Sequence, residues 1–164
     1  MELRRKLYRT DQILMIIISI NFLMAAYALY VELKHENNQS YQALCDVNPT
    51  ISCTKVMTTK WGKGFGILPE SLAFRNPIFG FLFYTIIFLM ITAIKPNLFI
   101  CKALISLAIL SNLATIYLAI IMIYIIKFVC LLCIMTYVFN FLLLIYSIVR
   151  YRTVKQLQTK SKLR

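Results

Sequence analysis

The sequence has few charged residues and few of the residues that make turns in soluble proteins. Charged residues make up 15% of the 164 residues, whereas hydrophobic residues make up 60%. Only four glycines and four prolines are present, which excludes collagen-like repeats and low-complexity disorder. Ordinary soluble domains carry roughly a quarter charged residues, so an ordinary soluble globular protein is also disfavoured. The length fits a single domain, and the excess of apolar residues indicates a bilayer environment.

Uncharged runs predict where the chain crosses the membrane. Four stretches contain no charged side chain: residues 12–31, 76–94, 103–126 and 128–147. A spanning helix needs about 20 mostly apolar residues, and none of these stretches alternates like a β-strand. The sequence therefore predicts an all-α integral membrane protein with four transmembrane helices over residues 12–33, 76–95, 99–126 and 128–149. A loop over residues 34–75 and a tail over residues 150–164 complete this single domain.

The first apolar stretch has two interpretations. Arg4, Arg5 and Lys6 precede an apolar run that reaches Ala26-Tyr27-Ala28, a pattern similar to a cleaved signal peptide. The run continues to Val31, which is long for a signal, so we expect an uncleaved signal anchor. Under either interpretation, residues 34–75 lie on the same side of the membrane.

The basic residues are distributed unevenly, although the formal net charge is +12. Twelve of the 18 lysines and arginines lie near the termini and in the second connection: Arg4, Arg5, Lys6, Arg9, Lys95, Lys102, Arg150, Arg152, Lys155, Lys160, Lys162 and Arg164. The positive-inside rule therefore predicts cytosolic termini and places residues 34–75 across the membrane. Because the basic charge flanks lipid, nucleic-acid binding is not expected. Residues 160–164 resemble a dilysine-type retrieval signal of the endoplasmic reticulum, although a solvated basic tail has the same composition.

The chemistry resides in the five cysteines. Cys45 and Cys53 lie in the 34–75 segment, on the oxidising side where disulfides persist. Cys130 and Cys133 form a Cys-Leu-Leu-Cys motif in the first turns of the last predicted helix, which starts on that same side. Cys101 lies near the cytosolic end of the third predicted helix, where we expect a small apolar filler, with lipidation as a minor alternative.

Three interpretations of the four grouped cysteines are open. Zinc is disfavoured because the pairs lack tetrahedral ligand spacing and the only histidine, His35, is remote. Two structural disulfides are the second interpretation. The third is a redox relay, in which the helix N-terminus and nearby Lys127 favour a thiolate at Cys130. In that relay, a dithiol at the membrane exchanges electrons with the loop pair.

The last predicted helix also carries a polar stripe. At about 100° per residue, Cys130, Cys133, Tyr137 and Asn140 fall on one face. Hydrogen bonding between helices is one explanation. The other is a pocket wall with two thiols and a phenol, which suits an apolar ring bearing carbonyl oxygens. The second explanation predicts a quinone-like substrate.

Several motifs together resemble the vitamin K epoxide reductase family. They are Ala43-Leu44-Cys45-Asp46-Val47, Ile51-Ser52-Cys53, Trp61-Gly62-Lys63-Gly64-Phe65-Gly66, Asn76-Pro77-Ile78-Phe79-Gly80 and Cys130-Leu131-Leu132-Cys133-Ile134-Met135-Thr136-Tyr137. The resemblance runs in order from about Tyr41 to Asn140. It looks like the animal type, with four helices and no fused thioredoxin-like domain. It implies a lumenal loop or cap that bears a redox cysteine pair.

The resemblance implies a role for each matched residue. Cys130 and Cys133 match the catalytic pair, and Cys45 and Cys53 match the loop pair that re-reduces it. The implied substrate- and inhibitor-binding residues are Asn76, Tyr137, Trp61, Phe65, Phe79, Val56 and Met57. Asn76 and Tyr137 match the side chains that hydrogen-bond carbonyl oxygens. Two departures concern the cap: the segment between Gly66 and Asn76 is shorter than in vertebrate members, and Met57 replaces an expected aromatic residue. Asn76 before Pro77 also predicts a helix N-cap.

The implied reaction is reduction of vitamin K 2,3-epoxide to the quinone, and of the quinone to the hydroquinone. The implied electron donors are lumenal thioredoxin-like relatives of protein disulfide isomerase, and coumarin-type inhibitors such as warfarin are implied ligands. We expect no metal and no tightly bound cofactor, and an endoplasmic reticulum membrane location. Two alternatives are open. One is a quinone-dependent disulfide-generating enzyme that runs the relay in reverse. The other is a non-enzymatic four-span scaffold.

Overall fold

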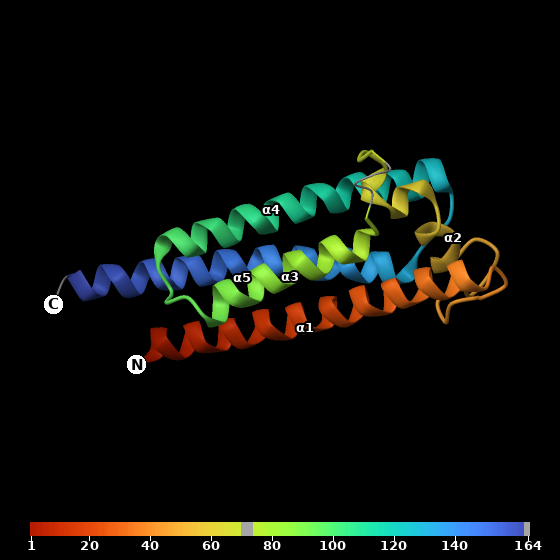
Figure 1. The fold of residues 1–164 in the computed structure, drawn as a ribbon. Helices are drawn as coiled ribbons and strands as arrows, with labels where there is room; N and C mark the ends of the chain where they lie inside the picture. The colour runs from red at the N-terminus through yellow and green to blue at the C-terminus, as the bar shows by residue number, and fades with distance from the viewer. Residues whose placement is uncertain (70–73, 163–164) are drawn as a thin grey trace.

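Long helices form most of the molecule and pack lengthwise as a bundle (Figure 1). The computed structural model describes residues 1–69 and 74–162. The long helices are α1 (Glu2–Asn37), α3 (Asn76–Thr92), α4 (Leu98–Ile120) and α5 (Leu131–Lys162). A π-helical segment, η4 (Ile121–Ile126), continues α4. Within the described residues only isolated β-bridges occur, so the expected all-α fold is confirmed there.

Three of these helices are long and apolar enough to cross a membrane. They span Glu2–Asn37, Leu98–Ile126 and Leu131–Ser161, with mean hydropathies of 2.2, 2.3 and 2.2 in their most apolar windows. The fourth, α3, is equally apolar in character but has only 17 residues. The structure therefore supports a membrane protein, whereas the count of four spans stays a prediction.

The helices extend beyond the uncharged runs that predicted them. α1 begins at Glu2, and α5 continues to Lys162 where a tail was expected from residue 150. The predicted boundary between the last helix and a tail at residue 150 is therefore corrected: residues 150–162 continue the helix. Hydropathy marks the membrane-facing part of a helix, but the backbone stays helical because residues 150–162 contain good helix formers and no glycine or proline. Residues 163–164 of the predicted tail and residues 70–73 of the predicted loop lie outside the described residues.

A tightly packed core holds the four long helices together at the end that carries the termini. Leu14, Ile87, Leu104 and Leu143 are fully buried there, one from each helix. Arg150 is also fully buried: its Nε donates to Asp11 Oδ1 at 2.7 Å and its Nη1 to Cys101 Sγ at 3.4 Å. The arginine thus ties α5 to α1 and α4, and Cys101 packs as the buried small residue expected from the sequence.

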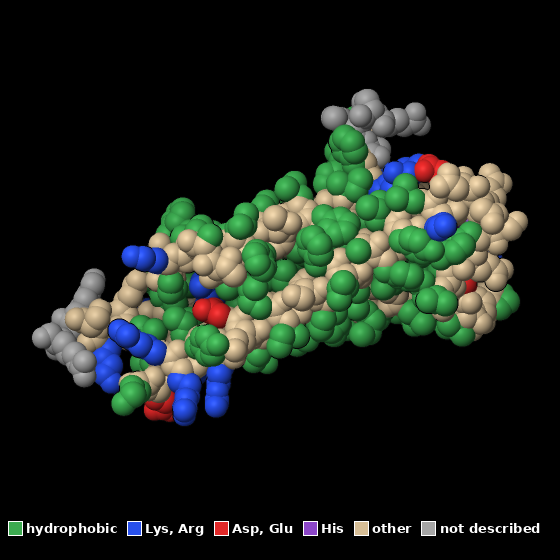
Figure 2. Space-filling view, turned by 60° about the horizontal axis from the view of Figure 1, so that its bottom comes forward, with side chains coloured by type: hydrophobic (Ala, Val, Ile, Leu, Met, Phe, Trp, Pro, Cys, Tyr) green, Lys and Arg blue, Asp and Glu red, His purple; other side chains and the backbone are tan. Residues whose placement is uncertain are grey.

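The two ends of the bundle differ in charge. Both termini lie at one end, and the loop segment lies at the other (Figure 1). Lysines and arginines gather at the end with the termini, and hydrophobic side chains cover the middle (Figure 2). This arrangement agrees with the charge distribution behind the topology prediction. The compartment that each end faces stays a prediction.

Three short helical turns form a cap over the bundle. They are α2 (Cys53–Met57), η1 (Lys60–Gly62) and η2 (Gly64–Gly66), and we call residues 53–66 the cap. The cap turns sharply at Gly66, which has a φ of +69° and lies so close to the Trp61 ring that a Cβ would overlap it. A glycine at this position therefore lets Trp61 lie flat against the backbone.

Candidate functional site

The loop cysteines are paired. Cys45 and Cys53 form a disulfide with their Cα atoms 5.7 Å apart, whereas Cys130 and Cys133 are free thiols. The structure thus describes an oxidised loop pair beside a reduced helix pair. Cys53 is fully buried and Cys45 is half-buried, so only one sulfur of the disulfide faces the exterior.

Asp46 organises the loop around this disulfide. Its Oδ1 accepts hydrogen bonds from Ser52 Oγ at 2.8 Å and Thr54 N at 3.0 Å. Its Oδ2 accepts from Ala43 N at 2.8 Å and Thr54 Oγ1 at 2.6 Å. Burial alone would raise the pKa of Asp46, but these hydrogen bonds hold it below that of an ordinary aspartate. The carboxylate therefore stays ionised at neutral pH and keeps all four acceptor bonds.

The two cysteine pairs lie against each other. Ser52 N donates to Val129 O, and Val129 N donates to Thr50 O, both at 2.9 Å. These bonds join the residue before Cys53 to the residue before Cys130. Both cysteines are fully buried in one apolar cluster. The structure therefore brings the loop and helix cysteines together, as a relay requires.

Cys130 lies at the start of α5 and caps it. The helix begins at Leu131, one residue after Cys130, although the sequence placed this cysteine inside the first turns. Its Sγ accepts the backbone N–H of Cys133 at 3.2 Å. A sulfur that carries negative charge is stabilised at this end of a helix. Lys127 is exposed and has a φ of 60°, and its expected effect on the Cys130 thiolate stays a prediction.

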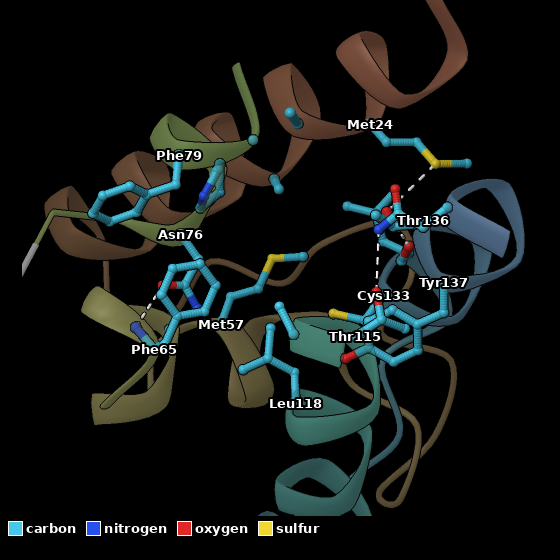
Figure 3. Close-up of a pocket in the computed structure, with 18 of the residues that line it drawn as sticks. Met24, Met57, Phe65, Asn76, Phe79, Thr115, Leu118, Cys133, Thr136 and Tyr137 are labelled. Carbon is cyan, nitrogen blue, oxygen red and sulfur yellow. Dashed lines mark hydrogen bonds between the residues drawn. The ribbon is translucent and has the colours of Figure 1, made fainter. Parts of the chain in front are cut away.

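A cavity of about 530 Å³ lies between the cap and the bundle (Figure 3). Cys133 lines it, and so do all seven residues predicted to bind substrate: Val56, Met57, Trp61, Phe65, Asn76, Phe79 and Tyr137. Phe65 and Asn76 lie on one side of it, opposite Cys133 and Tyr137 (Figure 3). The lining does not include the other three cysteines of the relay. Cys133 therefore faces the cavity, while Cys130 faces the loop.

Asn76 holds the cap to the bundle. Its Nδ2 donates to Trp61 O at 2.7 Å, and its Oδ1 accepts from Phe65 N at 2.9 Å. The predicted N-cap role is wrong, because Arg75 is the N-cap of α3 and Asn76 lies in its first turn. The amide instead pairs with backbone groups of the cap, which no other element satisfies. One amide hydrogen of Asn76 is left for a ligand.

Comparison with known proteins identifies the family. Residues 12–148 match the sequence model of the Vitamin K epoxide reductase family. The chain belongs to the vitamin K epoxide reductase family. It is 35% identical over 127 residues to vitamin K epoxide reductase complex subunit 1 of Rattus norvegicus, covering 71% of this chain and 75% of the relative. It is 34% identical over 134 residues to the Mus musculus protein of the same name, covering 76% and 80%. The resemblance that the cysteine, glycine and asparagine motifs indicated is confirmed.

In this family member, the polar stripe of α5 divides into two parts. Tyr137 lines the cavity, and its hydroxyl has no hydrogen-bond partner within the described residues. Asn140 also lines the cavity, but it bonds between helices: its Oδ1 accepts from Tyr84 Oη at 2.8 Å and its Nδ2 donates to Thr115 Oγ1 at 3.1 Å. The pocket explanation therefore applies to Tyr137, and both explanations apply to Asn140.

Sequence analysis missed several polar residues that line the same cavity. Four of them are Asn21, Glu32, Tyr84 and Thr115. Each is a polar or ionisable residue within or beside an apolar run, where such residues are rare, so the sequence marks them as candidates. The sequence did not indicate which helix faces they occupy. Within residues 1–69 and 74–162, no group of three or more His, Cys, Asp or Glu is placed to hold a metal ion.

Proposed function

We propose that this chain is a membrane oxidoreductase that reduces vitamin K 2,3-epoxide to the quinone, and the quinone to the hydroquinone. One observation carries the proposal: Cys133 shares a cavity with Asn76 and Tyr137, while Cys130 is buried with Cys53 behind it. A lipid-soluble ring suits this cavity, which apolar side chains line predominantly. The rat and mouse relatives, both vitamin K epoxide reductase complex subunit 1, support the substrate.

In the proposed chemistry, Cys133 is the nucleophile. Its thiolate attacks an epoxide carbon, the C–O bond breaks, and the oxygen takes a proton. The Asn76 amide and the Tyr137 hydroxyl donate hydrogen bonds to ring oxygens that gain negative charge. The Cys130 thiolate then attacks the Cys133 sulfur. The C–S bond breaks, its electron pair forms the quinone double bond, and the former epoxide oxygen, already a hydroxyl, takes a second proton and leaves as water; the two cysteine thiols supply both protons overall.

The disulfide between Cys130 and Cys133 is then reduced by the loop pair. The Cys53 thiolate attacks Cys130 and releases Cys133, after which Cys45 attacks Cys53 and closes the loop disulfide. Depth supports this order, because Cys133 lies about 4.5 Å further along α5 than Cys130. The redox state of the structure, with the loop pair oxidised and the helix pair reduced, is the one that precedes attack on the substrate.

In this proposal, a lumenal thioredoxin-like protein reduces the loop disulfide after each cycle. The partner's thiolate attacks the Cys45 sulfur, which frees Cys53 beside Cys130 and leaves a mixed disulfide between the partner and Cys45. The partner's second thiol then displaces Cys45, so the partner leaves with a disulfide and both loop cysteines are thiols. Burial supports this choice, since Cys45 is half-buried and Cys53 is fully buried. Leu44 and Val47 flank Cys45 and are 91% and 64% exposed, which offers an apolar surface to the partner. A four-span topology in the endoplasmic reticulum membrane, with both termini cytosolic, places this surface in an oxidising compartment.

Turnover by the purified protein tests the function. With vitamin K epoxide and a dithiol as reductant, we expect the quinone and then the hydroquinone to form. The Cys133→Ala variant serves as the inactive control. Absence of epoxide turnover by a folded wild-type protein would contradict the proposal.

The reverse reaction is the second candidate, because reduction potentials rather than residues set the direction of a relay. It predicts that the protein oxidises a reduced partner while a quinone accepts the electrons. The same preparation separates the two candidates. Disulfide formation in a reduced thioredoxin-like protein, without epoxide turnover, would favour the disulfide-generating enzyme.

A further inference from the structure

Four charged side chains meet where the cap joins the bundle. Glu32 and Glu36 lie on α1, Lys63 lies between η1 and η2, and Arg75 precedes α3. Arg75 Nε lies 3.4 Å from Glu32 Oε2, and Arg75 Nη2 donates to Glu36 Oε2. Lys63 Nζ lies 3.8 Å from Glu36 Oε1. Three segments that are distant in sequence are thus joined by charge.

Burial distinguishes the members of this cluster. The Glu32 side chain is 5% exposed and that of Arg75 is 23% exposed, whereas those of Glu36 and Lys63 are about half exposed. Exposed ion pairs contribute little to stability, but removing one partner of a buried pair is costly because the other charge is stranded. The pair of Glu32 and Arg75 is therefore the most buried contact of the cluster. It is an ion pair without a hydrogen bond, because Glu32 Oε2 accepts none within the described residues.

This pair acts on the residues that close the cavity. Arg75 directly precedes Asn76, and a short antiparallel bridge joins Arg75 to Lys63. Beside the bridge, Gly64 N donates to Phe74 O at 2.8 Å. Glu32 also lines the cavity, and it is the one carboxylate among the lining residues described. The pair thus connects α1 to the cap and to the start of α3 at one point.

We propose that Glu32 is a positioning residue, whose ion pair with Arg75 latches the cap and the first turn of α3 onto α1. The latch holds Asn76 in place for the ligand and keeps the cap closed over the cavity. The inference rests on the proposed function only in taking this cavity as the substrate site. The latch itself is a property of the protein without substrate.

Hydrogen exchange of the full-length protein in lipid nanodiscs tests the latch without any substrate. The amides of Gly64 and Phe65 report the closed cap, since their hydrogen bonds go to Phe74 O and Asn76 Oδ1. We expect Glu32→Gln to lower their protection factors by about 5- to 30-fold, because the closed cap becomes less stable relative to the open cap. Protection of amides in α5 should not change, which separates a local opening from global destabilisation.

Matched variants isolate the pair. Glu36→Gln removes the exposed carboxylate of the same cluster, and we expect it to leave cap protection within about twofold of wild type. Arg75→Gln removes the ion pairs to both Glu32 and Glu36, so we expect it to lower cap protection at least as much as Glu32→Gln. The double variant Glu32→Gln/Arg75→Gln should be no worse than Arg75→Gln alone, because the arginine that pairs with Glu32 is already gone. Arg75→Gln also keeps the test decisive if Glu32→Gln does not fold. Quenching of Trp61, the only tryptophan, gives a second readout of cap opening.

Three results would overturn the latch. They are unchanged cap protection in Glu32→Gln and Arg75→Gln, equal losses in Glu36→Gln, and additive losses in the double variant. None of these results depends on turnover. Wild-type protein that fails to reduce the epoxide would contradict the proposed function and leave the exchange result standing.

Discussion

At the residue scale, Asn76 and Tyr137 line one cavity but differ in the hydrogen bonds that they make to the rest of the protein. Asn76 makes two hydrogen bonds to the cap: its Nδ2 donates to Trp61 O, and its Oδ1 accepts from Phe65 N. Tyr137 bonds to no side chain or backbone group within the described residues, so its hydroxyl is available to a ligand. A substitution at Asn76 therefore mixes structural and functional effects, whereas one at Tyr137 separates them.

Tyr137→Phe tests the hydroxyl alone. It removes one hydrogen bond to a developing negative charge, so we expect kcat/KM for the epoxide to fall by about 5- to 150-fold, equivalent to about 1–3 kcal/mol. The melting temperature should not change. Tyr84→Phe is the matched control, because it removes a hydroxyl that bonds Asn140 in the same cavity and should lower the melting temperature more than the rate. Unchanged turnover in Tyr137→Phe would place the substrate elsewhere.

Asp46 predicts how the loop responds to acid. The pKa of Asp46 is lower in the folded protein than in the unfolded chain, so its ionised form stabilises the loop. That stabilisation is complete above about pH 5 and is lost as the pH falls through the lowered pKa. Limited proteolysis of residues 38–58 in wild type and Asp46→Asn is the measurement. We expect faster cleavage of the variant at neutral pH, and a difference that disappears in acid; a difference that grows in acid would refute this role.

At the element scale, the start of α5 and the segment before α2 act as one unit. Backbone bonds between Val129 and both Thr50 and Ser52 hold the two segments in register. The register sets which sulfurs meet, because Cys53 follows one segment and Cys130 follows the other. Cys133 then turns toward the cavity from the first turn of the helix. The division of labour between the two helix cysteines follows from where α5 begins.

Single cysteine variants test that division. Cys133→Ala leaves Cys130 facing the loop disulfide, so we expect a mixed disulfide between Cys53 and Cys130 with Cys45 as a free thiol. Cys130→Ala leaves Cys133 able to attack substrate but without a resolving thiol, so we expect a covalent adduct on the Cys133 peptide. Mass spectrometry of non-reduced digests detects both species. If the adduct forms on Cys130 and the mixed disulfide on Cys133, the assigned order of electron flow is inverted.

At the scale of the whole molecule, the redox groups lie at one end and 12 of the 18 lysines and arginines lie toward the other. The loop disulfide and cap lie at one end of the bundle, and both termini lie at the other (Figure 1). Hydrophobic side chains cover the surface between them (Figure 2). A molecule of this form, placed across a bilayer, keeps its disulfide chemistry in one compartment and most of its basic charge in the other.

Labelling of sealed microsomes tests the orientation. We expect a membrane-impermeant maleimide to label Ser161→Cys directly and to label Gln39→Cys only after permeabilisation, since both positions are exposed on the protein. The unsubstituted protein provides the background from its own cysteines. The reverse pattern would place the loop in the cytosol, where Cys45 and Cys53 would be kept reduced.

The sequence predicted the helices, the charged end and the cysteine pairs, because these depend on local composition. Apolar runs and basic clusters interact with the bilayer through their local composition. Their positions along the chain can therefore be predicted without knowing which helices pack together. The resemblance carried by the family's motifs also assigned Cys133, Asn76 and Tyr137 to one site. The whole predicted cavity lining proved to be contiguous for the same reason.

Only the tertiary structure decided which groups from distant segments meet. The sequence predicted that Asn76 is the N-cap of the helix that follows it. Folding instead brings Trp61 O and Phe65 N to its side-chain amide, which bonds these backbone groups and not those of its own helix. The sequence did not single out Glu32, which folding buries at the cavity beside Arg75. Hydrogen bonds and ion pairs act over a few ångströms, so they depend on packing that composition and periodicity do not specify.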